Sequence, residues 1–153
     1  MVSEDHPKLY ITEGHGESEL SAVFAEQIEK QNIETVTFTL LNSDTVPEEA
    51  DVVLIHAPTS DISGEEKDML AEYTANGGKL MVMAGPVEEG ELTNLYGLLG
   101  EYGVEVQEGI VVEGDRSHYA FQQPYILLPE MTDHEITNPL TESNYPILFT
   151  AQP

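Results

Sequence analysis

Hydrophobic and polar positions follow two different periods along the first two thirds of the chain. Residues 8–14 are predicted to form the first strand, and residues 51–58 and 79–86 are continuous apolar runs of strand length. Such runs are expected of central parallel strands that are covered on both faces. Residues 34–41 instead alternate apolar side chains with threonines, which predicts an edge strand with one covered face.

Three segments between these strands have the helical period. Residues 18–32 carry apolar side chains on one face, and residues 92–102 do the same. In the segment between them, Ser63 and Glu66 have capping-box spacing, and the stretch ends at "NGG" (76–78). The side chains predicted to face inward are Leu20, Val23, Phe24 and Ile28 in the first helix, Met69, Leu70 and Tyr73 in the second, and Leu92, Leu95, Leu98, Leu99 and Tyr102 in the third.

The alternation of strands and helices predicts an α/β fold, a three-layer, doubly wound and mainly parallel sheet. In such a sheet the loops that follow the first, third and fourth strands meet at one rim. These loops are residues 14–18, 58–63 and 85–91, and any small-molecule site is expected there.

The last third of the chain is less regular. Short strands are predicted at 104–106, 109–114, 125–128 and 146–150, but five of the nine prolines follow Gly114. We therefore expect a single domain over residues 1–153, with a core at about 8–114. Residues 115–153 form an irregular, proline-rich tail that is expected to pack on the sheet edge or rim.

The charge balance excludes several kinds of partner. The 153 residues include 29 acidic and five basic side chains, for a net charge of −24. Such a surface repels nucleic acid and anionic lipid, so we expect neither as a partner. No apolar run approaches the ~18 residues needed to cross a bilayer, and the start, "MVSEDHPK", does not resemble a signal peptide. Direct membrane insertion by this chain is not expected.

The turn after the first strand, "GHGE" (14–17), partly resembles a phosphate-binding loop. The residues around it argue against phosphate binding. Residues 14–16 begin like a dinucleotide fingerprint, but Glu19 stands where the third glycine is required, and no Gly-Lys-Ser/Thr motif occurs. The carboxylates of Glu13, Glu17 and Glu19 would also repel a phosphate. We therefore expect no nucleotide cofactor.

Catalytic and metal-binding signatures are weak. The chain has no cysteine and no Gly-x-Ser-x-Gly elbow, and Gly85 and Pro86 follow the fourth strand where a nucleophile would stand. None of the five histidines pairs with another at a ligand spacing, so no metal is expected. His15 is interpreted first as fixing the shape of its loop. Glu13 and Glu17 form a weak candidate for the acid/base pair of a glycoside hydrolase.

The order of several motifs resembles a known family over about Lys8 to Phe149. "GHGE" is followed by "VPEEAD" (46–51), "DISGEEKDMLAEYTANGGKLMVMAGP" (61–86), "LYGLLGEYGVEVQEGIVVEGD" (95–115) and "LLPEMTDHEIT" (127–137). This arrangement resembles the auxiliary domain of GldG-type ABC transporter components, a family named for bacterial gliding motility. The resemblance implies a flavodoxin-like or class I glutamine amidotransferase-like sheet without enzymatic residues.

The resemblance also implies a function. It predicts a non-catalytic auxiliary domain of an ABC-type transport system, outside the cytoplasm, as the soluble part of a membrane-anchored protein. Its partners would be the membrane subunits of the transporter, with a small molecule or carbohydrate as a further ligand. No cofactor and no catalytic residue are expected. The predicted ligand-binding residues are Gly14, His15, Gly16, Glu17, Pro58, Asp61, Gly85, Pro86 and His118.

Two other functions stay open at this stage. One is a carbohydrate-binding or hydrolytic enzyme that uses His15, acidic residues at the rim such as Glu13, Glu17 and Asp61, and tail residues such as Asp115 and His118. The other is a structural spacer in a larger envelope complex.

Overall fold

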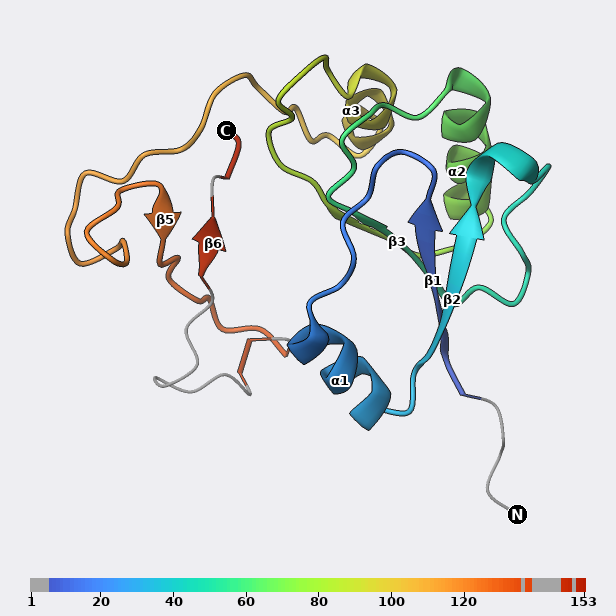
Figure 1. The fold of residues 1–153 in the computed structure, drawn as a ribbon, viewed down its shortest axis with the longest axis horizontal. Helices are drawn as coiled ribbons and strands as arrows, with labels where there is room; N and C mark the ends of the chain where they lie inside the picture. Colours follow the sequence, from blue (N-terminus) through green and yellow to red (C-terminus); the bar gives the residue numbers. More distant parts are fainter. Residues whose placement is uncertain (1–5, 136, 139–146, 150) are drawn as a thin grey trace. The chain divides into compact units, whose positions relative to one another are not determined.

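The computed structural model describes residues 6–135, 137–138, 147–149 and 151–153 (Figure 1). The chain divides into two compact units, Met1–Glu105 and Val106–Pro153, which are described separately. The expectation that the C-terminal residues pack on the sheet edge or rim of a single domain stays a prediction.

The first unit is built on a four-stranded sheet in which every pair of neighbouring strands is parallel. Its strands are β1 (Lys8–Glu13), β2 (Glu34–Thr39), β3 (Val52–His56) and β4 (Leu80–Met83), in the order β2-β1-β3-β4. The prediction of a parallel α/β sheet is confirmed, as is the edge position of β2.

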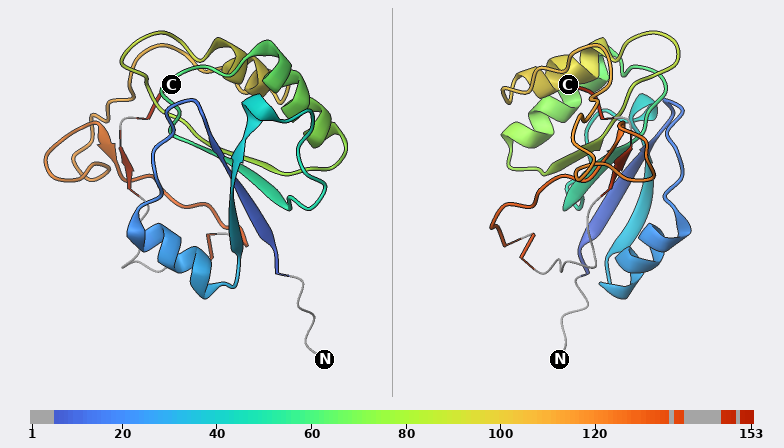
Figure 2. Two further views of the ribbon diagram at one scale, coloured as in Figure 1. Left: turned by 45° about the vertical axis from the view of Figure 1, so that its right-hand side comes forward. Right: turned by 90° about the vertical axis from the view of Figure 1, so that its left-hand side faces the viewer.

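The helices lie on both faces of this sheet. Helix α1 (Ala22–Lys30) connects β1 to β2, α2 (Gly64–Ala75) connects β3 to β4, and α3 (Thr93–Gly100) follows β4. The chain steps outward in opposite directions at β1–β2 and at β3–β4, so right-handed crossovers place α1 and α2 on opposite faces. Figure 2 shows α1 on one side of the strands and α2 and α3 on the other, which is the predicted three-layer, doubly wound arrangement.

The main hydrophobic core lies on the face of the sheet that carries α2 and α3. Tyr10 and Phe38, from neighbouring strands, meet there edge to face, with ring centroids 5.9 Å apart. A short 3-10 turn (Leu40–Asn42) after β2 adds one more buried leucine. The core consists of Tyr10, Phe38, Leu40, Val46, Ala50, Val53, Ile55, Ile62, Leu70, Leu92, Leu95 and Leu98.

Three sequence expectations for this unit are wrong. Strand β4 is not central: it ends the order of the sheet, and Met81 and Met83 are partly exposed. Val23 is exposed because α1 is a short helix that buries only Ile28. Tyr102 is exposed because α3 ends at Gly100, before the tyrosine can turn toward the core.

In the described part of the second unit, β5 (Ile126–Leu127) pairs antiparallel with β6 (Leu148–Phe149). These strands fall where the sequence predicted them. The predicted strands at 104–106 and 109–114 are not formed. Within 109–114, the Val111 N–H donates to Ala151 O and the Glu113 N–H to Pro124 O, and these separate contacts make no ladder. Within the described residues, no helix is both long and apolar enough to cross a membrane.

Candidate functional site

The "GHGE" turn needs its glycines for two physical reasons. Gly14 and Gly16 have φ values of +118° and +71°, a region that L side chains rarely adopt. A Cβ atom on Gly16 would lie 2.0 Å from the Thr59 Oγ1 atom. The turn after β1 therefore packs directly against the loop after β3, as expected for loops at the carboxyl ends of neighbouring parallel strands.

His15 is buried at the centre of this contact, with 5% of its surface exposed. Its ring lies between two carboxylates: Nε2 is 3.1 Å from Glu66 Oε2, and Nδ1 is 3.6 Å from Glu17 Oε1. Its backbone oxygen accepts hydrogen bonds from the N–H groups of Thr59 (2.9 Å) and Ser60 (3.0 Å). His15 thus joins its own turn to the loop after β3 and to α2.

Glu66 connects the histidine to the start of α2. Its Oε2 atom accepts a hydrogen bond of 2.7 Å from the Ser63 N–H, and the Ser63 hydroxyl accepts one of 3.2 Å from the Glu66 N–H. This is the capping box that the sequence predicted. The contact between Glu66 and His15 was not predicted, because the two residues are 51 positions apart and no local pattern joins them.

Three buried side-chain atoms in β1, the turn after it and α2 have no hydrogen-bond partner among the described residues. They are Thr12 Oγ1, His15 Nδ1 and Glu66 Oε1, on side chains that are all at least nine-tenths buried. Among the residues described, no three histidine, aspartate or glutamate side chains gather closely enough to hold a metal ion. The contacts of His15 and Glu66 therefore hold the turn after β1 to the loop after β3 and to α2.

Asp61 has a role in the structure that the sequence did not suggest. Its carboxylate accepts hydrogen bonds from the N–H groups of Asn94 (2.7 Å) and Leu95 (3.1 Å), at the start of α3. The Asn94 side-chain amide donates to Ile62 O at 2.7 Å. Asp61 therefore caps α3 from the loop after β3, a function that Leu92 at the N-cap position cannot perform.

The other predicted residues are not all joined to the turn. Pro58 is buried in the loop after β3, whereas Gly85 is half-buried and Pro86 is exposed in the loop after β4. His118 lies in the second unit, where its Nε2 atom is 3.3 Å from Glu130 Oε1. The structure thus brings residues 14–17 together with the loop at 58–61.

A groove of about 950 Å³ runs beside the turn, between α1 and the strands β1 and β2. Its floor is largely apolar or threonine-rich, and no lysine or arginine lines it. Of the nine predicted ligand-binding residues, Glu17 alone lines this groove, together with Glu13 of the acid/base alternative. The acidic lining residues are Glu13, Glu17, Glu19, Glu26, Glu29 and Glu34.

Comparison with known proteins identifies one family and several similar solved structures, including the two described below. The family described as "ABC-type uncharacterized transport system" matches residues 6–150. The mmIFT52 N-terminal domain has a TM-score of 0.67 at 18% identity, over 94% of this chain and 70% of that one, and shows a shared fold. PurLQS from Thermotoga maritima has a TM-score of 0.47 at 13% identity, over 94% of this chain and 64% of that one. No curated protein matches the chain.

Proposed function

This chain belongs to the ABC-type uncharacterized transport system family, and on that premise we propose that it is a non-catalytic auxiliary domain that binds a partner protein. The partner we propose is a membrane subunit of the transporter. We also propose that binding takes place outside the cytoplasm, as the resemblance to GldG-type components implies.

The observation that carries the non-catalytic part of this proposal is the burial of His15 between Glu17 and Glu66, whereas the family match supports the partner role. A general acid or base must come within hydrogen-bond reach of its substrate. Here the Nε2 atom of the histidine is already 3.1 Å from the Glu66 carboxylate, and both residues are at least 95% buried. This arrangement supports a structural role for the cluster.

The remaining polar groups at the rim support the same conclusion. The Asp61 carboxylate caps α3. The His56 Nδ1 atom lies 2.7 Å from Ser18 O, and the Ser18 N–H donates to His56 O. We propose that residues 14–17, together with Pro58 and Asp61, keep the rim loops in the shape that a partner recognises.

The proposal is tested by affinity capture from native membranes, with the whole chain as bait. We expect enrichment of ABC-transporter membrane or ATP-binding subunits over an unrelated acidic protein of similar net charge, which controls for non-specific electrostatic capture. Enrichment no greater than that of the control would contradict the partner role. Hydrolysis of glycosides or amides by the wild type, lost in Glu17→Ala, would contradict the non-catalytic role and support the hydrolase alternative.

A further inference from the structure

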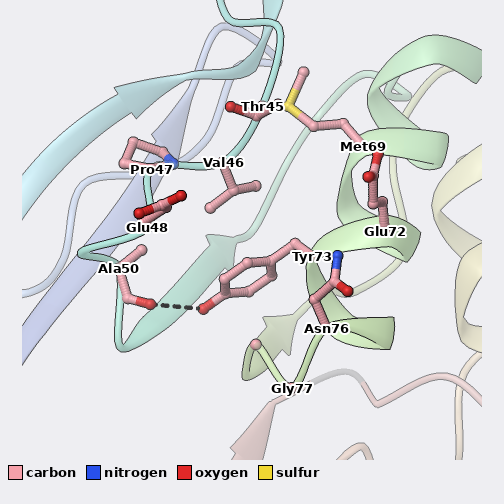
Figure 3. Close-up of a pocket in the computed structure, with 11 residues that line it drawn as sticks. Thr45, Val46, Pro47, Glu48, Ala50, Met69, Glu72, Tyr73, Asn76 and Gly77 are labelled. Carbon is pink, nitrogen blue, oxygen red and sulfur yellow. Dashed lines mark hydrogen bonds between the residues drawn. The ribbon is translucent and has the colours of Figure 1, made fainter.

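A second cavity lies at the opposite end of the sheet from the "GHGE" turn. It has a volume of about 450 Å³ and opens between the loop before β3 and the C-terminal end of α2 (Figure 3). Val46, Ala50, Met69 and the ring of Tyr73 give it an apolar wall. Its volume falls in the range of about 300–1,000 Å³ that is usual for ligand pockets.

The aromatic ring of this pocket is held in place by the backbone. The Tyr73 hydroxyl donates to Ala50 O at 3.1 Å, and it also lies 3.4 Å from Lys79 O. The ring packs closely over Gly78, where an added Cβ atom would lie 2.4 Å from ring carbons. Tyr73 thus spans from α2 to the loop before β3 and offers a fixed aromatic face (Figure 3).

The charged side chains that line the pocket are both acidic. Glu48 and Glu72 approach it from opposite sides, one from the loop before β3 and one from α2 (Figure 3). Neither carboxylate makes an ion pair within the described part of the chain, where the lysine pairs are formed by Glu26, Glu49 and Glu101. The side chain of Lys79 does not line the pocket.

The end of α2 adds to this negative field. The helix has acidic residues in its first turn and no basic residue in its last turn, so the negative end of its dipole is uncompensated. Asn76, Gly77 and Gly78, which end the helix, line the pocket. Glu72 stands near that end of the helix, where a carboxylate is unfavourable and a cation is favourable.

We propose that this pocket binds the guanidinium group of an arginine side chain presented by a partner protein. A guanidinium stacks on an aromatic face, here Tyr73, while its aliphatic stem packs on apolar surface, here Val46 and Met69. Glu48 and Glu72 complement its charge. A second copy of this chain is a poor source of the arginine because each copy carries a net charge of −24. The protein source of the arginine rests on the proposed partner-binding function.

The test is an NMR titration of the whole chain with N-acetyl-arginine methylamide at low salt. The neutral isostere, N-acetyl-citrulline methylamide, serves as the matched probe. We expect saturable shifts of the Gly77 and Gly78 amides with the arginine compound, and binding about tenfold weaker or undetectable with the citrulline compound. Linear, non-saturating shifts, or equal binding of both compounds, would overturn the proposal.

Two double variants with the same change in net charge separate the pocket from the general acidity of the surface. E48Q/E72Q should weaken arginine binding about tenfold, whereas E65Q/E91Q, at exposed positions outside the pocket, should leave it within about twofold of wild type. Equal losses in the two variants would show non-specific attraction and overturn the site.

The membrane capture experiment, repeated with E48Q/E72Q, tests the source of the arginine. Reduced capture of transporter subunits supports an arginine on the partner. Unchanged capture together with binding of the free arginine compound overturns the partner as the source. Absence of pocket binding with capture intact overturns this inference and leaves the proposed function standing. Pocket binding without any transporter capture contradicts the proposed function instead.

Discussion

At the scale of single residues, Gly16 combines a left-handed backbone with a close approach to Thr59. We expect Gly16→Ala to lower the free energy of unfolding by about 2 kcal/mol or more, because it adds backbone strain and forces the Thr59 side chain to move. Urea unfolding measures the change.

Gly103→Ala is the matched control for this prediction. Gly103 has a similar φ of +79°, but an added Cβ there would meet open space. Gly103→Ala should therefore lower the free energy of unfolding by the backbone strain alone, about 1–2 kcal/mol. Equal losses at the two glycines would show that the contact with Thr59 contributes nothing.

Because of Tyr10, we expect the free energy of unfolding to fall as the pH rises in the alkaline range. Burial raises the pKa of its hydroxyl, and the hydrogen bond from that hydroxyl to Glu49 and the charges of Glu49 and Glu34 raise the pKa further. Because the folded-state pKa is raised, this contribution to stability is complete below the unfolded value of about 10 and is lost as the pH rises through the folded value.

Tyr10→Phe should consequently reduce the loss of unfolding free energy between pH 8 and pH 11, measured by urea unfolding at both pH values. Glu49→Gln should reduce it partly, since it removes one charge and keeps the phenol. The same loss in wild type and Tyr10→Phe would show that Tyr10 does not cause it.

The surroundings of His15 were only partly predictable from the sequence. The glycines on either side predicted a tight turn, and Glu17, two residues away, was a visible neighbour. The contact with Glu66 was not predictable, because it depends on how α2 is placed after the β3 crossover. The same holds for Asp61, which looked like a rim carboxylate and caps a helix 33 residues further on.

At the scale of elements, the start of α3 depends on a carboxylate from another loop. Asp61→Ala should cost about 1 kcal/mol of unfolding free energy, the usual cost of losing an N-cap acceptor. Amide hydrogen exchange at Asn94 and Leu95 should accelerate in the same variant. Asp61→Asn keeps an acceptor oxygen and should lower the free energy of unfolding by less. Equal decreases in the two variants would contradict the capping role.

The positions of the helices and of most strands followed from the sequence, because their periods and capping signals are local. The helix α2 is the clearest case, with Ser63 and Glu66 forming the predicted capping box. The prediction that β4 is a central strand was wrong, because a continuous apolar run also occurs in an edge strand. The predicted strand at 109–114 is not formed, because a strand also needs a neighbouring strand with which to form a ladder.

At the scale of the whole molecule, the net charge of −24 works against compactness. Salt screens repulsion between exposed carboxylates, with a Debye length of about 10 Å at 0.1 M. We expect the melting temperature to rise by about 3 °C between 0.02 and 0.3 M NaCl, corresponding to roughly 1 kcal/mol. Thermal unfolding followed by circular dichroism measures this shift.

The triple variant E88Q/E89Q/E91Q removes three exposed charges from the loop after β4 and should reduce this salt dependence. A melting temperature that does not change with salt in the wild type would show that the acidic side chains are spaced widely enough not to destabilise the fold.

The α/β class, the turn glycines and the capping box of α2 followed from the sequence alone, which also predicts that nucleic acid is not a partner. These follow from period, backbone sterics and net charge, which are properties of neighbouring residues or of the whole composition. The folded structure was needed to show that Glu66 joins Glu17 in enclosing His15, that Asp61 caps α3, and that Glu48 and Glu72 line the same pocket as the Tyr73 ring. The contacts of His15 with Glu66 and of Asp61 with the start of α3 join residues 51 and 33 positions apart, because parallel strands with helical crossovers bring distant loops to the same end of the sheet.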